Sequence, residues 1–328
     1  MTRPALLGRS AAVGELVRRR ASGGRTGRGG PARPDRPRGP GRHPRVAPYL
    51  FITPFFLLFL PFGAGSVLFA LGMAFVDWPL GATPEYVGTD NFSTVLTDTL
   101  FGRAMSNTFR MLVVFLLALV PLCLFVAVLL RQLKRRTANL VQIVVFAPIT
   151  MSLIAVALVF DLLYNERVGL VNGTLESLGF EPVMFLSDAN LAPWSIVLLR
   201  IWRVLGYYAV ILFAGLQSIP EEYYEAASLD GAGAWQQFRY ITFPLLKPVT
   251  AFVLVASSIA AWELFAEVDV LTDGGPARST LTAVMYIFQA SFEEFSLGEG
   301  AAASAVLAVA IITSTLIVNR VLRSADHA

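Results

Sequence analysis

Six blocks of apolar residues, each long enough to cross a lipid bilayer as a helix, most constrain the fold of this chain, because about 20 residues span the hydrocarbon core. Charged residues make up only 15% of the chain, against roughly 25% in an average soluble domain. The blocks also lack the regular polar stripe of a helix from a soluble protein. Pro121 and Pro148 are expected to kink the second and third helices. We therefore predict an all-α polytopic membrane protein with six transmembrane helices, at about residues 49–76, 106–130, 138–163, 193–217, 249–272 and 300–322.

The first 45 residues form a strongly basic arm. They contain twelve Arg and only two acidic residues, Glu15 and Asp35. They are also rich in Gly and Pro and poor in large apolar residues. Such a composition does not bury a core, so residues 1–45 are expected to be a disordered cytoplasmic arm and residues 46–328 the transmembrane domain. The arm has the charge to contact anionic lipids or nucleic acid. We expect membrane lipids as partners and no nucleic acid.

Basic residues next to the apolar blocks predict the orientation of the chain. If residues 1–45 are inside, twenty Lys and Arg fall in inner segments and three, Arg103, Arg167 and Arg278, in outer ones. Cytoplasmic segments of membrane proteins carry this excess of positive charge. Both termini and the polar loop 218–248 are therefore expected in the cytoplasm, with the chain in the plasma membrane.

Residues that could carry enzymatic chemistry are scarce. The single cysteine, Cys123, lies within a span and is expected to be a packing residue, and His43 and His327 lie outside the spans, so no His/Cys metal site is predicted. The chain also lacks the G-x-x-x-x-G-K-[ST] phosphate-binding loop. We expect a protein that is not an enzyme and binds no metal or cofactor. A membrane-embedded enzyme would require a catalytic cluster that the sequence does not contain.

The polar loop 218–248 has its own helical signals. Ser218 and Glu221 have the spacing of a capping box. Two short helices are expected on either side of Gly231, because glycine interrupts a helix, and the second should end before Pro244. Two short helices joined at a glycine would form a protruding knob, where a mutation disturbs docking more than folding.

The same loop carries a family pattern. Glu225-Ala226-Ala227, Gly231, Ile241 and Pro244 stand at the spacing EAA-x3-G-x9-I-x-L-P, with Phe243 in place of the usual Leu. This resembles the coupling loop of the membrane subunits of bacterial ABC importers. Residues 164–172 and 271–276 are similar to segments of sugar-type permeases, in particular the first membrane subunit of maltose- and glycerol-phosphate-type importers. The resemblance covers about residues 46–323.

The resemblance implies a type I importer fold with six transmembrane helices. It implies four kinds of partner: a second permease, two ATPase subunits that bind ATP and Mg, an extracytoplasmic solute-binding protein and the solute. The solute would be a sugar or a sugar derivative, or alternatively glycerol phosphate, a polyol or another small molecule. The residues expected to contact the ATPase or to anchor the loop are Glu225, Ala226, Ala227, Gly231, Ile241 and Pro244.

Charged and aromatic residues within the spans are candidates for the substrate pathway. A charge inside a bilayer usually faces protein or water. Arg200 and Arg203 in the fourth span reach a depth similar to that of Glu263 and Glu267, which should lie one turn apart on one face of the fifth span. We predict pairing between these helices; contact with substrate hydroxyls, or snorkelling at a helix end, are the alternatives. The aromatic candidates for stacking on a sugar ring are Trp202, Tyr207, Tyr208 and Trp262.

Overall fold

The computed structural model describes residues 47–78 and 83–324, so the expected basic arm, residues 1–45, lies outside the described residues. The chain divides between Phe59 and Leu60 into two compact units. The described part of the first unit is α2 (Ala47–Phe59), an apolar helix with a proline in its interior. Its large side chains, such as Phe51 and Leu57, are exposed, as expected of a helix that faces lipid.

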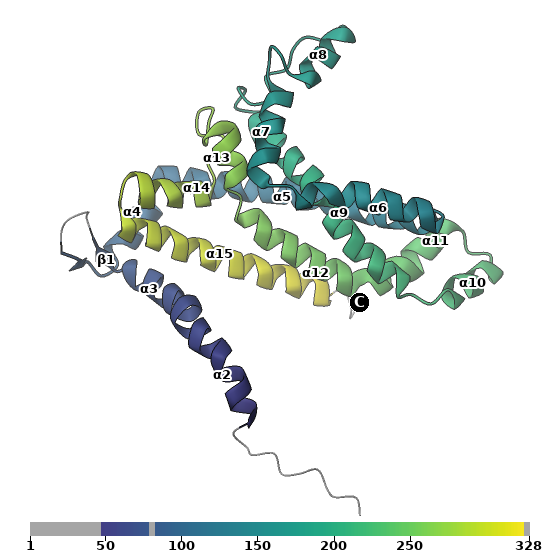
Figure 1. Ribbon diagram of the computed structural model, residues 1–328, viewed down its shortest axis with the longest axis horizontal. Coiled ribbons are helices and arrows are strands. Elements are labelled where there is room, and N and C mark those ends of the chain that lie inside the picture. Colours follow the sequence, from purple (N-terminus) through teal and green to yellow (C-terminus); the bar gives the residue numbers. More distant parts are fainter. Residues whose placement is uncertain (1–46, 79–82, 325–328) are drawn as a thin grey trace, which may run out of the picture. The chain divides into compact units, whose positions relative to one another are not determined.

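The second unit is built almost entirely of helices, which confirms the all-α prediction (Figure 1). Two short strands, β1 (Val76–Asp77) and β2 (Glu85–Tyr86), pair in antiparallel register. The other elements, with η for a π-helix, are η1 (Leu60–Gly65), α3 (Ser66–Met73), α4 (Asp90–Thr97), α5 (Thr99–Gln132), α6 (Arg135–Thr150), α7 (Leu153–Tyr164), α8 (Leu170–Ser177), α9 (Ala192–Gln217), α10 (Glu222–Leu229), α11 (Ala234–Gln237), η2 (Phe238–Thr242), α12 (Phe243–Trp262), α13 (Ala266–Thr272), α14 (Ala283–Phe288), η3 (Gln289–Glu293) and α15 (Leu297–Ser324).

The six predicted spans have helical counterparts. In the described ranges, five stretches are long and apolar enough to cross a membrane, and α6 with α7 makes a sixth if that bent pair is one span. The pair bends by 98° just after Pro148, close to the predicted kink, whereas α5 runs through Pro121 as one 34-residue helix. The five stretches are Tyr49–Met73, Thr99–Gln132, Ala192–Gln217, Ala234–Trp262 and Leu297–Arg320.

The core of the second unit lies between α5 and α9, which pack side by side, with α12 against both (Figure 1). Cys123 is fully buried in this core, as expected of a packing residue. Helix α6 approaches α9 at Gly206, where an added Cβ would lie 1.9 Å from the carbonyl oxygen of Val145. Small residues permit such close contact between membrane helices. The buried core side chains include Met111, Phe115, Leu119, Ile196, Leu199, Leu212, Leu246 and Val253.

The fifth span differs from its prediction at both ends. The prediction placed it at 249–272, but the helical stretch begins at Ala234 and ends at Trp262. The chain then leaves the helical path before α13 begins at Ala266. Within this break, the backbone oxygen of Leu264 accepts a hydrogen bond of 2.7 Å from the Thr282 hydroxyl. Irregular backbone at membrane depth is stable when its polar groups are satisfied within the protein.

Candidate functional site

The polar loop begins where α9 ends, but not by the predicted capping box. Ser218 is the C-cap of α9, and its hydroxyl donates a 2.7 Å hydrogen bond to the backbone oxygen of Gly215. No side-chain hydrogen bond caps the start of α10 at Glu221. The capping-box prediction was therefore wrong, because the Ser218 hydroxyl bonds backward to α9, the helix that precedes it.

Gly231 turns the chain between the two short helices, as predicted. It has a φ of 79°, a left-handed conformation that glycine adopts without steric cost. The backbone N–H of Ala232 bonds to the oxygen of Ala227, and that of Gly231 to the oxygen of Ser228, at 2.9 and 3.1 Å. These two bonds form a Schellman motif, which ends α10. No described atom lies within 4 Å of a Cβ added here, so conformation, and not space, requires the glycine.

The second helix of the loop does not end before Pro244, contrary to prediction. It runs through η2 into α12 without a break, and Pro244 lies in the first turn of α12. In η2 the Phe243 N–H bonds to the oxygen of Phe238, five residues earlier. A proline lacks an N–H and crowds the preceding helical turn, and a π-helical turn is one way to accommodate it.

Side-chain contacts hold the loop against the end of α5. The hydroxyls of buried Tyr224 and Thr242 lie 2.9 Å apart and share a hydrogen bond. Arg131 lies over the Tyr224 ring, 3.9 Å from its centroid, and donates a 2.8 Å hydrogen bond to the Glu221 carboxylate. Gln237 donates to the Ser228 hydroxyl at 2.9 Å. Sequence reasoning did not predict these contacts, because they join residues that the motif does not include.

The predicted loop residues lie on or near the surface of this framework. Glu225, Ala226 and Gly231 are exposed, and Ala227, Ile241 and Pro244 are half-buried. Large apolar side chains surround them, which is unusual for a polar loop and typical of an interaction surface. Leu229, at 89% exposure, is the most exposed of this group, which consists of Tyr223, Leu229, Trp235 and Tyr240.

The predicted charge pairing joins α9 to α13. Arg200 Nη1 and Glu267 Oε1 lie 2.7 Å apart, with side-chain exposures of 13% and 2%. The Arg200 Nη2 group also donates to the backbone oxygen of Ala260, near the end of α12. Glu263 is exposed at the C-cap of α12. The prediction that Glu263 and Glu267 share one helical face was therefore wrong, because the helix ends between them.

The other pathway candidates differ in exposure. Tyr208 and Trp262 are buried, and the Trp262 indole donates a 3.0 Å hydrogen bond to Ser314. Trp202 and Tyr207 are about 40% exposed, at 43% and 40%. Arg203 is half-buried, and its Nε has no hydrogen-bond partner among the described residues. Packing in the core thus accounts for the positions of two of the four aromatic candidates, Tyr208 and Trp262.

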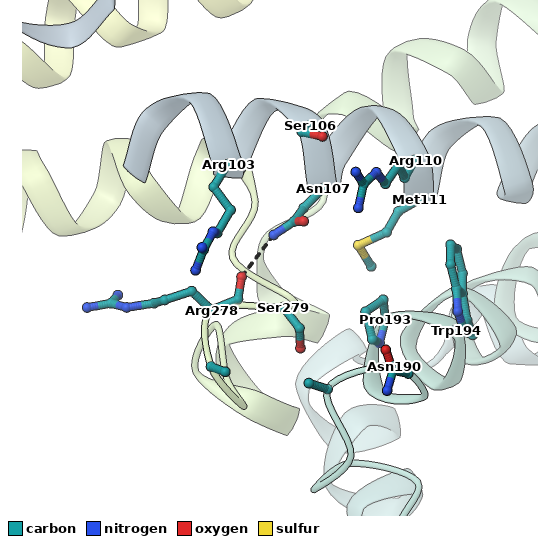
Figure 2. Close-up of a pocket in the computed structure, with 12 residues that line it drawn as sticks. Arg103, Ser106, Asn107, Arg110, Met111, Asn190, Pro193, Trp194, Arg278 and Ser279 are labelled. Atoms are coloured by element: carbon teal, nitrogen blue, oxygen red, sulfur yellow. Dashed lines mark hydrogen bonds between the residues drawn. The ribbon is translucent and has the colours of Figure 1, made fainter. Parts of the chain in front are cut away.

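A cavity of about 710 Å³, which the sequence analysis did not predict, lies at the opposite end of α5 from the loop (Figure 2). It is formed by the start of α5, the start of α9 and the turn after α13. The Asn107 amide donates to the backbone oxygens of Arg278 and Leu281, at 2.9 and 3.1 Å. The lining residues are Arg103, Ser106, Asn107, Arg110, Met111, Ala189, Asn190, Pro193, Trp194, Ala277, Arg278 and Ser279.

A family described as "Binding-protein-dependent transport system inner membrane component" matches residues 131–327. This chain belongs to that family. The arabinooligosaccharides transport system permease protein AraP of Bacillus subtilis (strain 168) is 34% identical over 275 residues, which cover 83% of this chain and 87% of AraP.

Two solved structures support the same assignment. One is a bacterial ABC transporter involved in the import of the acidic polysaccharide alginate, with a TM-score of 0.75, 25% identity, and coverage of 85% of this chain and 95% of the other. The second is a bacterial alginate ABC transporter in complex with an alginate pentasaccharide-bound periplasmic protein, with a TM-score of 0.76, 26% identity, and coverage of 85% and 94%.

Membership of the inner membrane component family confirms the resemblance drawn from the loop and the type I ABC importer fold. The relatives are transport permeases and not enzymes. The family match begins at residue 131, so it includes the loop and the Arg200–Glu267 pair. Two of the arginines that line the cavity, Arg103 and Arg110, precede it.

Proposed function

We propose that this permease forms half of the translocation pathway of an ATP-driven importer for a sugar or a sugar derivative. Two of its relatives are named for arabinooligosaccharides and for alginate, and its family is named for dependence on a binding protein. The other half of the pathway is a second permease. An extracytoplasmic solute-binding protein delivers the solute.

In this proposal, the loop 218–248 couples the permease to an ATPase subunit. The main support for this coupling is the exposed surface of the loop. Glu225, Ala226 and the region around Gly231 are exposed beside Leu229 and other exposed apolar side chains. An exposed apolar surface on a rigid support favours a protein partner. Two such ATPase subunits bind ATP and Mg, and the permease itself binds no cofactor.

Movement of the loop drives alternating access. The Tyr224–Thr242 hydrogen bond and the contacts of Arg131 with Tyr224 and Glu221 join α10 to α12 and α5. A displacement of α10 by the ATPase therefore reaches two helices of the core. The excess of Lys and Arg in the loop and terminal segments supports a cytoplasmic location for the loop and both termini.

The same machinery could import glycerol phosphate, a polyol or another small solute. One observation favours a charged solute within this range: the cavity at the far end of α5 is lined by three arginines among its described residues. Arg200 is a weaker argument for a charged solute, because it is already paired with Glu267.

Reconstitution tests this function. The permease, purified with its partner subunits and placed in liposomes, should take up labelled oligosaccharide only with ATP on the loop side and the binding protein on the other. Uptake without an ATPase subunit would refute the proposal.

A labelling experiment tests the orientation of the loop. Leu229→Cys in a Cys123→Ala background should react with an impermeant maleimide in inverted vesicles and not in intact cells; the reverse pattern would place the loop outside.

A further inference from the structure

The cavity of Figure 2 is strongly basic. Arg103 and Arg110 from α5 and Arg278 from the turn after α13 line it, and no carboxylate is among its described lining residues. None of the three belongs to an ion pair found in the described ranges, which are Arg131–Glu221 and Arg200–Glu267. A concave surface lined by charges of one sign concentrates ions of the opposite sign.

The carboxylate closest to the lining in sequence makes no ion pair with the three arginines in the described ranges. Asp188 lies two residues before Asn190, but its carboxylate accepts hydrogen bonds from the backbone N–H groups of Asn190 and Leu191, at 2.6 and 3.2 Å. Arg278 makes a 3.3 Å hydrogen bond with the neutral amide of Gln289. None of the three guanidinium groups is therefore paired with a carboxylate in the described ranges.

The remaining lining residues suit a saccharide. Asn107, Asn190 and two serines supply hydrogen-bonding groups, and Trp194, 40% exposed, supplies an aromatic ring. Sugars present hydroxyls at their edges and C–H groups on their faces, so they use both kinds of contact. The volume of about 710 Å³ lies within the range of roughly 300–1,000 Å³ that small-molecule sites occupy.

The turn that carries Arg278 is held in place. Ala277 and Arg278 have φ values of 51° and 61°, a left-handed conformation that side chains with a Cβ rarely adopt and that persists where surrounding contacts enforce it. The Asn107 amide supplies such contacts, to the backbone oxygens of Arg278 and Leu281. The Ser279 hydroxyl oxygen is buried with no hydrogen-bond partner among the described residues. A buried polar atom usually has a partner, and a ligand in the cavity would provide one.

We infer that this cavity binds the anionic group of a charged saccharide, a carboxylate or a phosphate carried on a sugar ring, through Arg103, Arg110 and Arg278. The inference rests on the proposed function and narrows its substrate class. A concave site of this size favours a small solute over a protein surface. A neutral sugar would leave three like charges uncompensated, so the cavity selects against it.

The test is a binding measurement on the complete importer in nanodiscs that contain only phosphatidylcholine, so that no anionic lipid is present. Calorimetry compares three probes: trigalacturonate, galactose 1-phosphate and a neutral galactose trisaccharide. The two anionic probes should bind more tightly than the neutral one, and Arg103→Gln or Arg278→Gln should weaken their binding about tenfold or more, as expected for loss of a hydrogen bond to a charged group. Arg103→Lys should restore part of the affinity.

Arg167→Gln is the matched control, because Arg167 is an exposed arginine that does not line this cavity. It should bind all probes as the unmodified protein does, and thermal unfolding should show that every variant is folded. Equal binding of anionic and neutral probes, or anion binding that survives Arg103→Gln and Arg278→Gln, overturns the inference. The inference is also overturned if none of the sugar probes binds and only an added anionic lipid does. The cavity would then be a lipid headgroup site.

A separate uptake assay distinguishes the two proposals. ATP-dependent uptake of a neutral sugar, at the same rate in both arginine variants, overturns the anion site and leaves the importer function standing. A complete lack of ATP-dependent uptake refutes the importer function, whereas the binding measurement still decides the anion site.

Discussion

Arg200 of α9 and Glu267 of α13 form a buried ion pair, with 2.7 Å between Nη1 and Oε1. The same guanidinium donates to the backbone oxygen of Ala260 and lies 5.7 Å from the centre of the Phe115 ring. One side chain thus stabilises the carboxyl end of α12, where basic groups are favoured, and fixes the start of the next helix.

Glu267→Gln should destabilise the protein far more than Glu263→Gln. Loss of one partner leaves the Arg200 charge buried and unpaired, at a cost of about 3–5 kcal/mol, whereas an exposed change such as Glu263→Gln costs about 0.5 kcal/mol or less. Chemical unfolding in detergent measures both. The double variant Arg200→Gln/Glu267→Gln should lose less than the sum of its single variants. Additive losses, or equal losses for the two glutamates, would contradict the pairing.

Gly231→Val should reduce ATP-driven transport and leave membrane insertion intact. A residue with a Cβ in the left-handed conformation costs about 1–2 kcal/mol, so the turn will shift and move the exposed face around Glu225. Gly233→Ala is the matched control, because Gly233 has a φ of −71° and should retain transport. Uptake and ATPase assays on both variants check this, and a fully active Gly231→Val would show that the turn is not needed for coupling.

Gly206→Ala should separate α6 from α9. The added methyl group would meet the Val145 carbonyl, and overpacking of this kind typically costs about 1–3 kcal/mol. The control is Gly173→Ala in α8, where no described atom lies within 4 Å of an added Cβ. The yield of folded protein and its thermal midpoint in detergent are the measurements. A Gly206→Ala protein as stable as the control would argue against the close approach.

Tyr286 should make the protein lose stability at alkaline pH. Its hydroxyl donates a 2.7 Å hydrogen bond to Asp98, and burial, followed by this bond, raises the pKa of the phenol above its usual value. Because the folded pKa exceeds the unfolded value of about 10, the stabilisation is complete below pH 10 or so and is lost as the pH rises towards the folded pKa. Thermal midpoints between about pH 8 and 11.5 should fall less steeply in Tyr286→Phe. Tyr223→Phe, at an exposed position, should behave like the unmodified protein.

The long apolar blocks and the left-handed glycine were predictable because each depends on local sequence. Composition predicts a helix long and apolar enough to span a membrane at 193–217, and Gly231 follows from the spacing of the motif. The end of α12 was not predictable, because the apolar pattern continues past it through Val268 and Leu271. That helix ends where Arg200, about 60 residues away in sequence, reaches the Ala260 carbonyl.

The basic cavity was missed for a similar reason. Arg103, Trp194 and Arg278 come from three separate segments of the chain. No local sequence pattern marks any of them as part of a binding site. Only packing brings them together (Figure 2). Arg103 and Arg278 are two of the only three basic residues assigned to outer segments, and both line this cavity.

The uninterrupted helical path from Ala234 to Trp262 has a mechanical consequence. Its 29 residues extend about 43 Å at 1.5 Å per residue, so one helical path connects Trp235 in the loop to the neighbourhood of Arg200. The wider turn at η2 lies on this path, between the loop and α12. In the proposed function, this helix carries motion of the loop towards Arg200, and the contacts of Arg131 with Tyr224 and Glu221 keep the loop joined to α5.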